Sequence, residues 1–167
     1  MKWIGVSGSW RKTCPELQHD LQREVTAVLQ RGDGIITGGA LGVDYLATNL
    51  ALQQAPDGSQ LKVFLPTSLE IYAAHYQQRA SEGVITQATA KDLIQQLLIV
   101  NSIGSLVVNL AETILNERTY YQRNTRVINA SDELLAFQVN SSAGTQDTID
   151  KARAHGVSVA LFRYTVD

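Results

Sequence analysis

The sequence is poor in the residues that bind metals or cross-link a chain. It has a single cysteine, Cys14, which excludes a disulfide within the chain and a zinc site built on cysteines. Its three histidines, His19, His75 and His155, have no cysteine or acidic partner at the spacing of metal ligands. We therefore expect no metal site, and the low cysteine content favours a cytoplasmic protein.

The sequence also lacks an excess of basic charge and a long, purely apolar run. Its 14 lysines and arginines stand against 16 acidic residues, so the formal net charge is −2. Proteins that live on duplex DNA usually carry a basic excess, so contact with a polyanion would here need a local patch. Residues 93–110 form the most apolar stretch, but glutamine, asparagine, serine and glycine interrupt it. This stretch predicts a buried or interface helix and no membrane span.

Length and composition are typical of one globular domain. A chain of 167 residues, of which 44% are hydrophobic and 18% are charged, can bury a core of its own. We expect a single domain over residues 1–167. We expect no signal peptide, because a strand-like segment follows Met1 almost directly.

Predicted strands and helices alternate along the chain. Short apolar runs predict buried strands at residues 3–8, 34–37, 61–65, 133–139 and 157–162. Helical spacing and capping residues predict helices over residues 13–31, 44–54, 69–80, 90–101, 112–129 and 145–155, with Thr13 capping the first and Gly104 ending the fourth. This alternation predicts an α/β, doubly wound, mainly parallel sheet with helices on both faces. In such sheets, ligands bind beyond the carboxyl ends of the strands.

A glycine turn follows the first predicted strand. In this segment, residues 5–11, Gly8 permits a sharp turn, Ser9 offers a hydroxyl and Arg11 can reach a phosphate. Glycines that end strands are also common for purely structural reasons, so this motif alone leaves both interpretations open.

A second glycine turn follows the second predicted strand. It has three glycines in five positions, Gly38, Gly39 and Gly42, with Ala40 among them. These residues let a ligand or a neighbouring backbone approach closely. Asp44 falls in the first turn of the following helix, where it complements the helix dipole, holds a ribose hydroxyl or orients the glycine turn.

A third turn, residues 140–145, again lies between a predicted strand and a predicted helix. Ser142 and Thr145 either cap that helix or join Gly144 and the backbone amides in an anion cradle.

The fourth motif is an arginine cluster on a predicted helix, residues 118–126. Arg123 and Arg126 are three residues apart and share a face, and Asn124 lies between them. A polar group embedded among arginines and tyrosines indicates a binding site. The alternative is a solvated face on which Arg123 pairs with a surface carboxylate, Glu117 or Glu133.

These four motifs, in this order, resemble the superfamily that joins the DNA-processing protein DprA/Smf with the LOG phosphoribohydrolases. Its Gly-Ser-Arg turn is similar to residues 8–11, its Ser-Gly-Gly-Ala-x-Gly-x-Asp motif to residues 37–44, its Arg-Asn-Arg motif to residues 123–126 and its Ser-Gly-Thr turn to residues 142–145. The resemblance spans residues 3–162 and is thinnest over residues 66–115. It implies a Rossmann-like sheet, a phosphate-bearing ligand at these turns and frequent dimers.

The sequence departs from both branches of this superfamily. LOG enzymes carry Pro-Gly-Gly-x-Gly-Thr-x-x-Glu, in which the glutamate serves catalysis, and Thr148 takes the place of that glutamate here. Cleavage of a ribose–base bond needs a carboxylate near the anomeric carbon, so we do not expect LOG-type hydrolysis. DprA carries extra domains and binds single-stranded DNA with a basic surface, whereas this chain is slightly acidic.

The sequence therefore predicts a homodimeric domain that binds a nucleotide or phosphoribosyl-type ligand. The alternatives are a recombination mediator that binds single-stranded DNA and a nucleoside 5′-monophosphate phosphoribohydrolase. We expect the dimer because residues 93–110 carry more apolar side chains than one helix needs to cover a sheet face.

Overall fold

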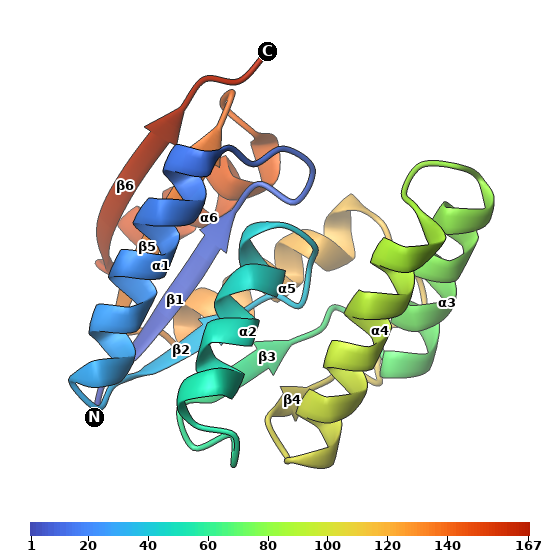
Figure 1. Ribbon diagram of the computed structural model, residues 1–167, viewed down its shortest axis with the longest axis horizontal. Helices are drawn as coiled ribbons and strands as arrows, with labels where there is room; N and C mark the ends of the chain where they lie inside the picture. The colour runs from blue at the N-terminus through green and yellow to red at the C-terminus, as the bar shows by residue number, and fades with distance from the viewer.

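The computed structural model describes residues 1–167 and arranges them around one six-stranded sheet (Figure 1). The strands are β1 (Trp3–Gly8), β2 (Gly34–Thr37), β3 (Leu61–Phe64), β4 (Leu106–Val107), β5 (Glu133–Val139) and β6 (Ser158–Tyr164). Their spatial order is β4-β3-β2-β1-β5-β6, and every neighbouring pair is parallel. The prediction of a Rossmann-like α/β fold is confirmed, and the sheet is wholly parallel.

Six helices connect these strands: α1 (Pro15–Gln30), α2 (Val43–Gln54), α3 (Leu69–Ser81), α4 (Gln87–Ser102), α5 (Glu117–Asn129) and α6 (Ala143–Ala154). Helices α1 and α2 cover one face of the sheet, and α5 and α6 cover the other (Figure 1). Helices α3 and α4 stand as a pair beyond the β3–β4 edge. The Gln96 side chain of α4 joins α2 by donating to the Tyr45 carbonyl at 2.9 Å. Helices on both faces were predicted, and this prediction is confirmed.

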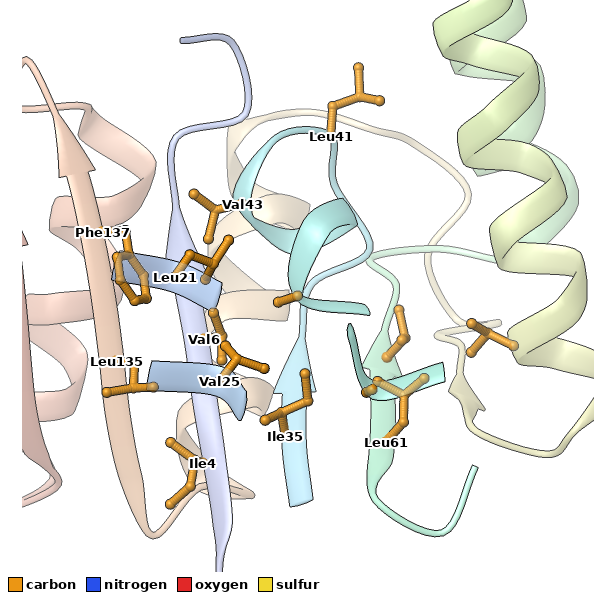
Figure 2. Close-up of a cluster of buried hydrophobic side chains, with 14 of the residues drawn as sticks. Ile4, Val6, Leu21, Val25, Ile35, Leu41, Val43, Leu61, Leu135 and Phe137 are labelled. Atoms are coloured by element: carbon orange, nitrogen blue, oxygen red, sulfur yellow. The ribbon is translucent and has the colours of Figure 1, made fainter. Parts of the chain in front are cut away.

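The larger part of the core lies between the sheet and helices α1 and α2. Figure 2 shows Leu21 and Val25 of α1 above side chains of several strands, among them Val6, Ile35 and Leu135. These residues are buried because helices cover both faces of the sheet. Strands in such a sheet favour apolar side chains, whose burial lowers the free energy of the folded state. This packing fixes the position of each strand end, and therefore the position at which the following loop begins.

The chain reverses direction across the sheet between β1 and β5. It first builds outward from β1 to β4, and then α5 returns it to β5, which pairs with β1 in the register Gly8↔Phe137. The connections that leave β1 and β5 therefore diverge to opposite faces. In open α/β sheets this switch point is where a crevice forms at the carboxyl ends of the strands.

The structure refines the prediction for residues 93–110. The expected end of the helix before Gly104 is confirmed, because α4 ends at Ser102 and Gly104 adopts a left-handed conformation with φ +78°, so the apolar stretch is not one helix. Leu106 and Val107 then form β4, a strand of two residues that the sequence analysis missed. No helix in the structure combines the length and the apolar character needed to cross a membrane.

Other predicted helix starts also differ from the structure, and α4 begins at Gln87, three residues before the predicted start. Helix α1 has Cys14, not Thr13, at its N-cap, and helix α6 begins at Ala143 rather than at residue 145. Helix α5 begins at Glu117, five residues after the predicted start, because Asn116 and Thr119 form a capping box.

Candidate ligand-binding site

A cleft of about 740 Å³ lies at the carboxyl ends of β1, β2 and β5, at the switch point of the sheet. The β1–α1 loop, the β2–α2 turn and the start of α6 form one side of it. Helix α5 and residues 75–85, which include the end of α3, form the other side. The volume lies within the range of about 300–1,000 Å³ that is usual for small-molecule sites.

Most of the ligand-binding residues predicted from the sequence line this cleft. They come from four separate segments, which the fold brings together: Gly8, Ser9, Arg11, Gly38, Ala40, Asp44, Arg123, Asn124, Ser142, Gly144 and Thr145.

Gly39 and Gly42 do not line the cleft. Both have a positive φ, near +69°, which favours glycine. A Cβ on Gly39 would lie 2.5 Å from the Leu65 side chain, and a Cβ on Gly42 would collide with the Ser9 carbonyl. These two glycines therefore let the β2–α2 turn pack against β3 and against the β1–α1 loop.

Arg126 also lies outside the cleft. Its guanidinium donates to the carbonyls of Leu65 and Val108 at 3.4 and 3.3 Å, and it stacks over the Phe64 ring at 5.3 Å. Arg126 thus connects α5 to the β3–β4 edge. A helix turns by about 100° per residue, so positions three apart differ by roughly 60° in direction. That difference aims Arg123 and Arg126 at different neighbours.

Arg123 and Asp44 meet at the floor of the cleft, and both are buried. The Gly38 peptide lies between them. Its N–H donates to the Asp44 carboxylate at 3.0 Å, and its carbonyl accepts a hydrogen bond from the Arg123 guanidinium. A second N–H, from Ala40, reaches the same Asp44 oxygen at 3.3 Å. Of the roles considered for Asp44, these contacts correspond to the orientation of the glycine turn.

The environment of Asp44 has opposing effects on its pKa. Burial raises the pKa above its ordinary value, while the charge of Arg123 and the two N–H donors act to lower it. Arg123 is not paired with either carboxylate proposed from the sequence. Glu133 binds Lys2 at 2.8 Å, and Arg123 donates instead to the Asn124 side chain at 3.1 Å. The buried guanidinium is therefore held by uncharged oxygens, and its charge is not cancelled by a direct ion pair.

Asn124 extends this network to helix α6. Its amide donates to Asp147 at 3.1 Å, and Lys151 donates to the same carboxylate oxygen at 2.8 Å and to the Tyr121 carbonyl at 2.7 Å. The contacts connect α5 and α6 beneath the cleft and fix the orientation of Asn124. The sequence analysis missed Asp147 and Lys151, whose spacing of four residues on a helix was the available signal.

The start of α6 presents hydrogen-bond donors to the cleft. Ser142 is the N-cap residue, but its hydroxyl donates to the Thr145 hydroxyl at 2.9 Å and makes no capping bond to the backbone. The first-turn N–H groups therefore lack a side-chain acceptor, which is the condition under which a helix N-terminus binds an anion. Arg11, Arg79 and Arg123 line the same cleft.

Helix α3 and the segment after it contribute residues that sequence reasoning did not connect with the site: His75, Tyr76, Arg79, Val84 and Ile85. Tyr76 is buried against Tyr72, with their hydroxyls 3.4 Å apart, and Tyr72 in turn donates to the Gly39 carbonyl at 2.9 Å. Burial raises the pKa of Tyr76 to about 12, so its hydroxyl stays protonated at neutral pH. The pair of tyrosines at i and i+4 was the local signal for this face of α3.

No protein-family model and no curated protein matches this sequence. Solved structures do match it. DNA processing protein A from Helicobacter pylori superposes with a TM-score of 0.70 at 19% identity, over 96% of this chain and 64% of that protein. DprA from Streptococcus pneumoniae has a TM-score of 0.53 at 14% identity, over 95% of this chain and 58% of that protein. TM1055, a LOG-family protein, has a TM-score of 0.57 at 17% identity, over 95% of this chain and 72% of that protein.

The fold is DprA/LOG-like. This confirms, at the level of the fold, the resemblance drawn from the four motifs. The chain spans less than two thirds of either DprA protein.

Thr148, which stands at the place of the LOG glutamate in the sequence motif, also lines the cleft. Thr148 is buried on α6, and its hydroxyl donates to the Gly144 carbonyl at 3.1 Å. Two carboxylates line the cleft: Asp44, which accepts hydrogen bonds from the glycine turn, and Glu117, which is exposed. Neither occupies the place of the LOG glutamate.

Proposed function

We propose that the cleft binds a nucleotide or phosphoribosyl-type ligand through its phosphate. The observation that carries this proposal is the buried Arg123 guanidinium, which makes no direct ion pair and lines the same cleft as the uncapped N-terminus of α6. Asp44, across the Gly38 peptide, offsets only part of the cost of burying this cation, and a phosphate would bind it directly.

Each predicted segment has a role in this proposal. The N–H groups at the start of α6 and the hydroxyls of Ser142 and Thr145 would hold phosphate oxygens, with Arg123 supplying charge. Arg11 lines the same cleft from the β1–α1 loop. Gly38 is needed without a side chain, because a Cβ there would lie 2.7 Å from the Arg123 guanidinium. Tyr76 and Tyr120 line the same cleft and would contact the ribose and base.

Binding of single-stranded DNA is the second candidate, and one observation favours it. Tyr120 and Tyr121 line the cleft together with three arginines, and bases stack on aromatic rings beside cations in strand-binding grooves. The Helicobacter pylori protein of the same fold binds single-stranded DNA. The net charge of −2 favours a small ligand over a long strand.

We do not propose hydrolysis of a ribose–base bond, because Thr148 supplies no charge to stabilise the positive anomeric carbon.

Calorimetry with AMP, a dinucleotide and short single strands tests these candidates together. We expect AMP to bind, with no release of free base. If only single strands bind, with an affinity that falls steeply as salt rises, DNA binding replaces the proposal. If none of these phosphorylated compounds binds, the proposed function is wrong. Release of adenine from AMP would establish the phosphoribohydrolase instead.

A further inference from the structure

A second hollow, of about 450 Å³, adjoins the cleft. It lies between the β1–α1 loop, the first turns of α2 and the start of α4. Four residues line both spaces: Trp10, Arg11, Val84 and Ile85. The two spaces therefore meet along one edge.

The shared edge carries exposed apolar side chains. Trp10 is 44% exposed and Val84 is 37% exposed, although both are large apolar residues. Tyr45 of α2 and Leu46 add apolar surface from the side of the hollow. A flat aromatic ring that covers an exposed indole beside other apolar groups lowers the free energy of the complex.

A positive charge at this edge is suited to a phosphate that links two nucleosides. The Arg11 guanidinium lies 5.2 Å from the centre of the Trp10 ring, on the boundary that the cleft and the hollow share. A phosphodiester that joins a nucleoside in the cleft to a second one in the hollow would cross this boundary. Thr13, Gln18 and Asp92 supply hydrogen-bonding groups around the hollow for the edge of a base.

We propose that the hollow is a second base-binding subsite, so that the natural ligand contains two linked nucleotides. One nucleotide occupies the cleft, which rests on the function proposed above. The linking phosphate meets Arg11, and the second base stacks on Trp10 between Tyr45 and Ile85. A free dinucleotide and two consecutive nucleotides of a single strand present this same chemistry.

The test compares AMP with the 5′-phosphorylated dinucleotide pApA by calorimetry. The proteins are the wild type, Trp10→Ala and Trp10→Phe. Wild type should bind pApA more tightly than AMP. Trp10→Ala should weaken pApA binding by roughly five- to 150-fold, the range for loss of one base–aromatic stack, with a much smaller effect on AMP. Trp10→Phe should recover most of the loss because it keeps a π-face.

A fluorescence measurement checks the same contact directly. Trp3 is the only other tryptophan, and it packs under Lys62 near the start of β1, at the end of the sheet away from the cleft. In the Trp3→Phe variant, all indole emission comes from Trp10. We expect pApA to quench this emission and AMP to leave it nearly unchanged.

Several outcomes would overturn the second subsite. If AMP binds and pApA binds no more tightly, the subsite is absent while the proposed function stands. If Trp10→Ala weakens both ligands equally, or neither, Trp10 holds no second base. If the wild type binds neither compound, both proposals fail. A short oligoadenylate distinguishes a free dinucleotide from a single strand as the natural ligand. If it binds much more tightly than pApA, the ligand is a strand, and if the two bind equally, the ligand is a free dinucleotide.

Discussion

At the scale of single residues, the Gly38 peptide organises the site. Its N–H donates to Asp44 and its carbonyl accepts from Arg123, so two buried charges of opposite sign are held at opposite edges of one peptide group. Burying such charges costs free energy that their attraction only partly returns. Their presence beneath a cleft therefore fits a ligand-binding role better than a stabilising one.

Removal of the Arg123 guanidinium should weaken ligand binding. A charge-assisted hydrogen bond contributes about 1.5–3 kcal/mol, so AMP should bind Arg123→Ala roughly ten- to hundredfold more weakly. Arg123→Lys should recover part of this loss, because an ammonium cannot reproduce the planar fork. Arg118→Ala is the matched control, since Arg118 lies on the same helix but is exposed and paired with Glu112 at 2.9 Å. Calorimetry that gives equal affinities for Arg123→Ala and Arg118→Ala would move the phosphate site away from Arg123.

Alanine substitutions at the adjacent Gly38 and Gly39 should affect different properties, ligand binding in the first case and stability in the second. Alanine at Gly38 would press on Arg123 and on Asp44, at 2.7 and 2.9 Å, and should abolish binding with a modest loss of stability. Alanine at Gly39 must adopt φ +69° and meets Leu65, so it should lower the free energy of unfolding by about 2–5 kcal/mol, the sum of left-handed strain and overpacking.

Denaturant unfolding and AMP titration of both glycine variants measure these effects. Gly83→Ala is the control, because Gly83 has φ +77° and open space around it, so it reports the strain alone. If Gly39→Ala is no less stable than Gly83→Ala, the packing against Leu65 does not limit this position.

At the scale of elements, the sequence predicted the order of strands and helices, but it did not predict that α3 forms one side of the cleft. The glycine turns follow strands and lead into helices, and local sequence alone identifies such positions. Tyr76 and Arg79 reach the cleft only because α3 and α4 fold back beyond the β3–β4 edge, which no local pattern encodes. The strand at residues 106–107 is too short to show a period, so only its pairing with β3 defines it.

The contact between β6 and α1 predicts a pH-dependent stability. Tyr164, at the end of the edge strand, donates to Asp20 of α1 at 2.6 Å. This bond, with a further contribution from Arg23, holds the pKa of Asp20 below its ordinary value of 3.8. A lowered pKa in the folded state means that the contribution of Asp20 is present above pH 3.8 and is lost as the pH falls through the folded-state pKa.

Tyr164→Phe should therefore be less stable than the wild type at neutral pH, and the difference should vanish in acid, below pH 3.8. Urea unfolding at a series of pH values measures this difference. Tyr121→Phe serves as the control, because the Tyr121 hydroxyl makes no hydrogen bond within the protein. A gap between wild type and Tyr164→Phe that persists unchanged in acid would show that packing, not the bond to Asp20, accounts for it.

At the scale of the whole molecule, the outer face of α4 carries apolar side chains that no other part of the chain covers. The inner face of α4 is used within the chain, because Leu93, Leu97 and Val100 are fully buried. Its outer face keeps Leu98 and Ile99 more than half exposed. The apolar excess noted in the sequence is therefore exposed at Leu98, Ile99 and Leu110, and only the first two of these lie on α4.

We propose that this outer face of α4 forms the interface of a homodimer. Leu98 is 53% exposed and Ile99 is 52% exposed on adjacent positions of one helix, and a second copy would cover them symmetrically. Leu98→Glu should abolish the dimer, because each interface would bury two unpaired carboxylates across the symmetry axis. Ile114→Glu is the control, since Ile114 is 60% exposed but lies on the loop before α5. Light scattering at tens of micromolar, a concentration at which interfaces of about micromolar affinity are largely assembled, should give a dimer mass for wild type and Ile114→Glu and a monomer mass for Leu98→Glu. A monomer mass for the wild type would remove the dimer, and a dimer mass for Leu98→Glu would place the interface on another surface.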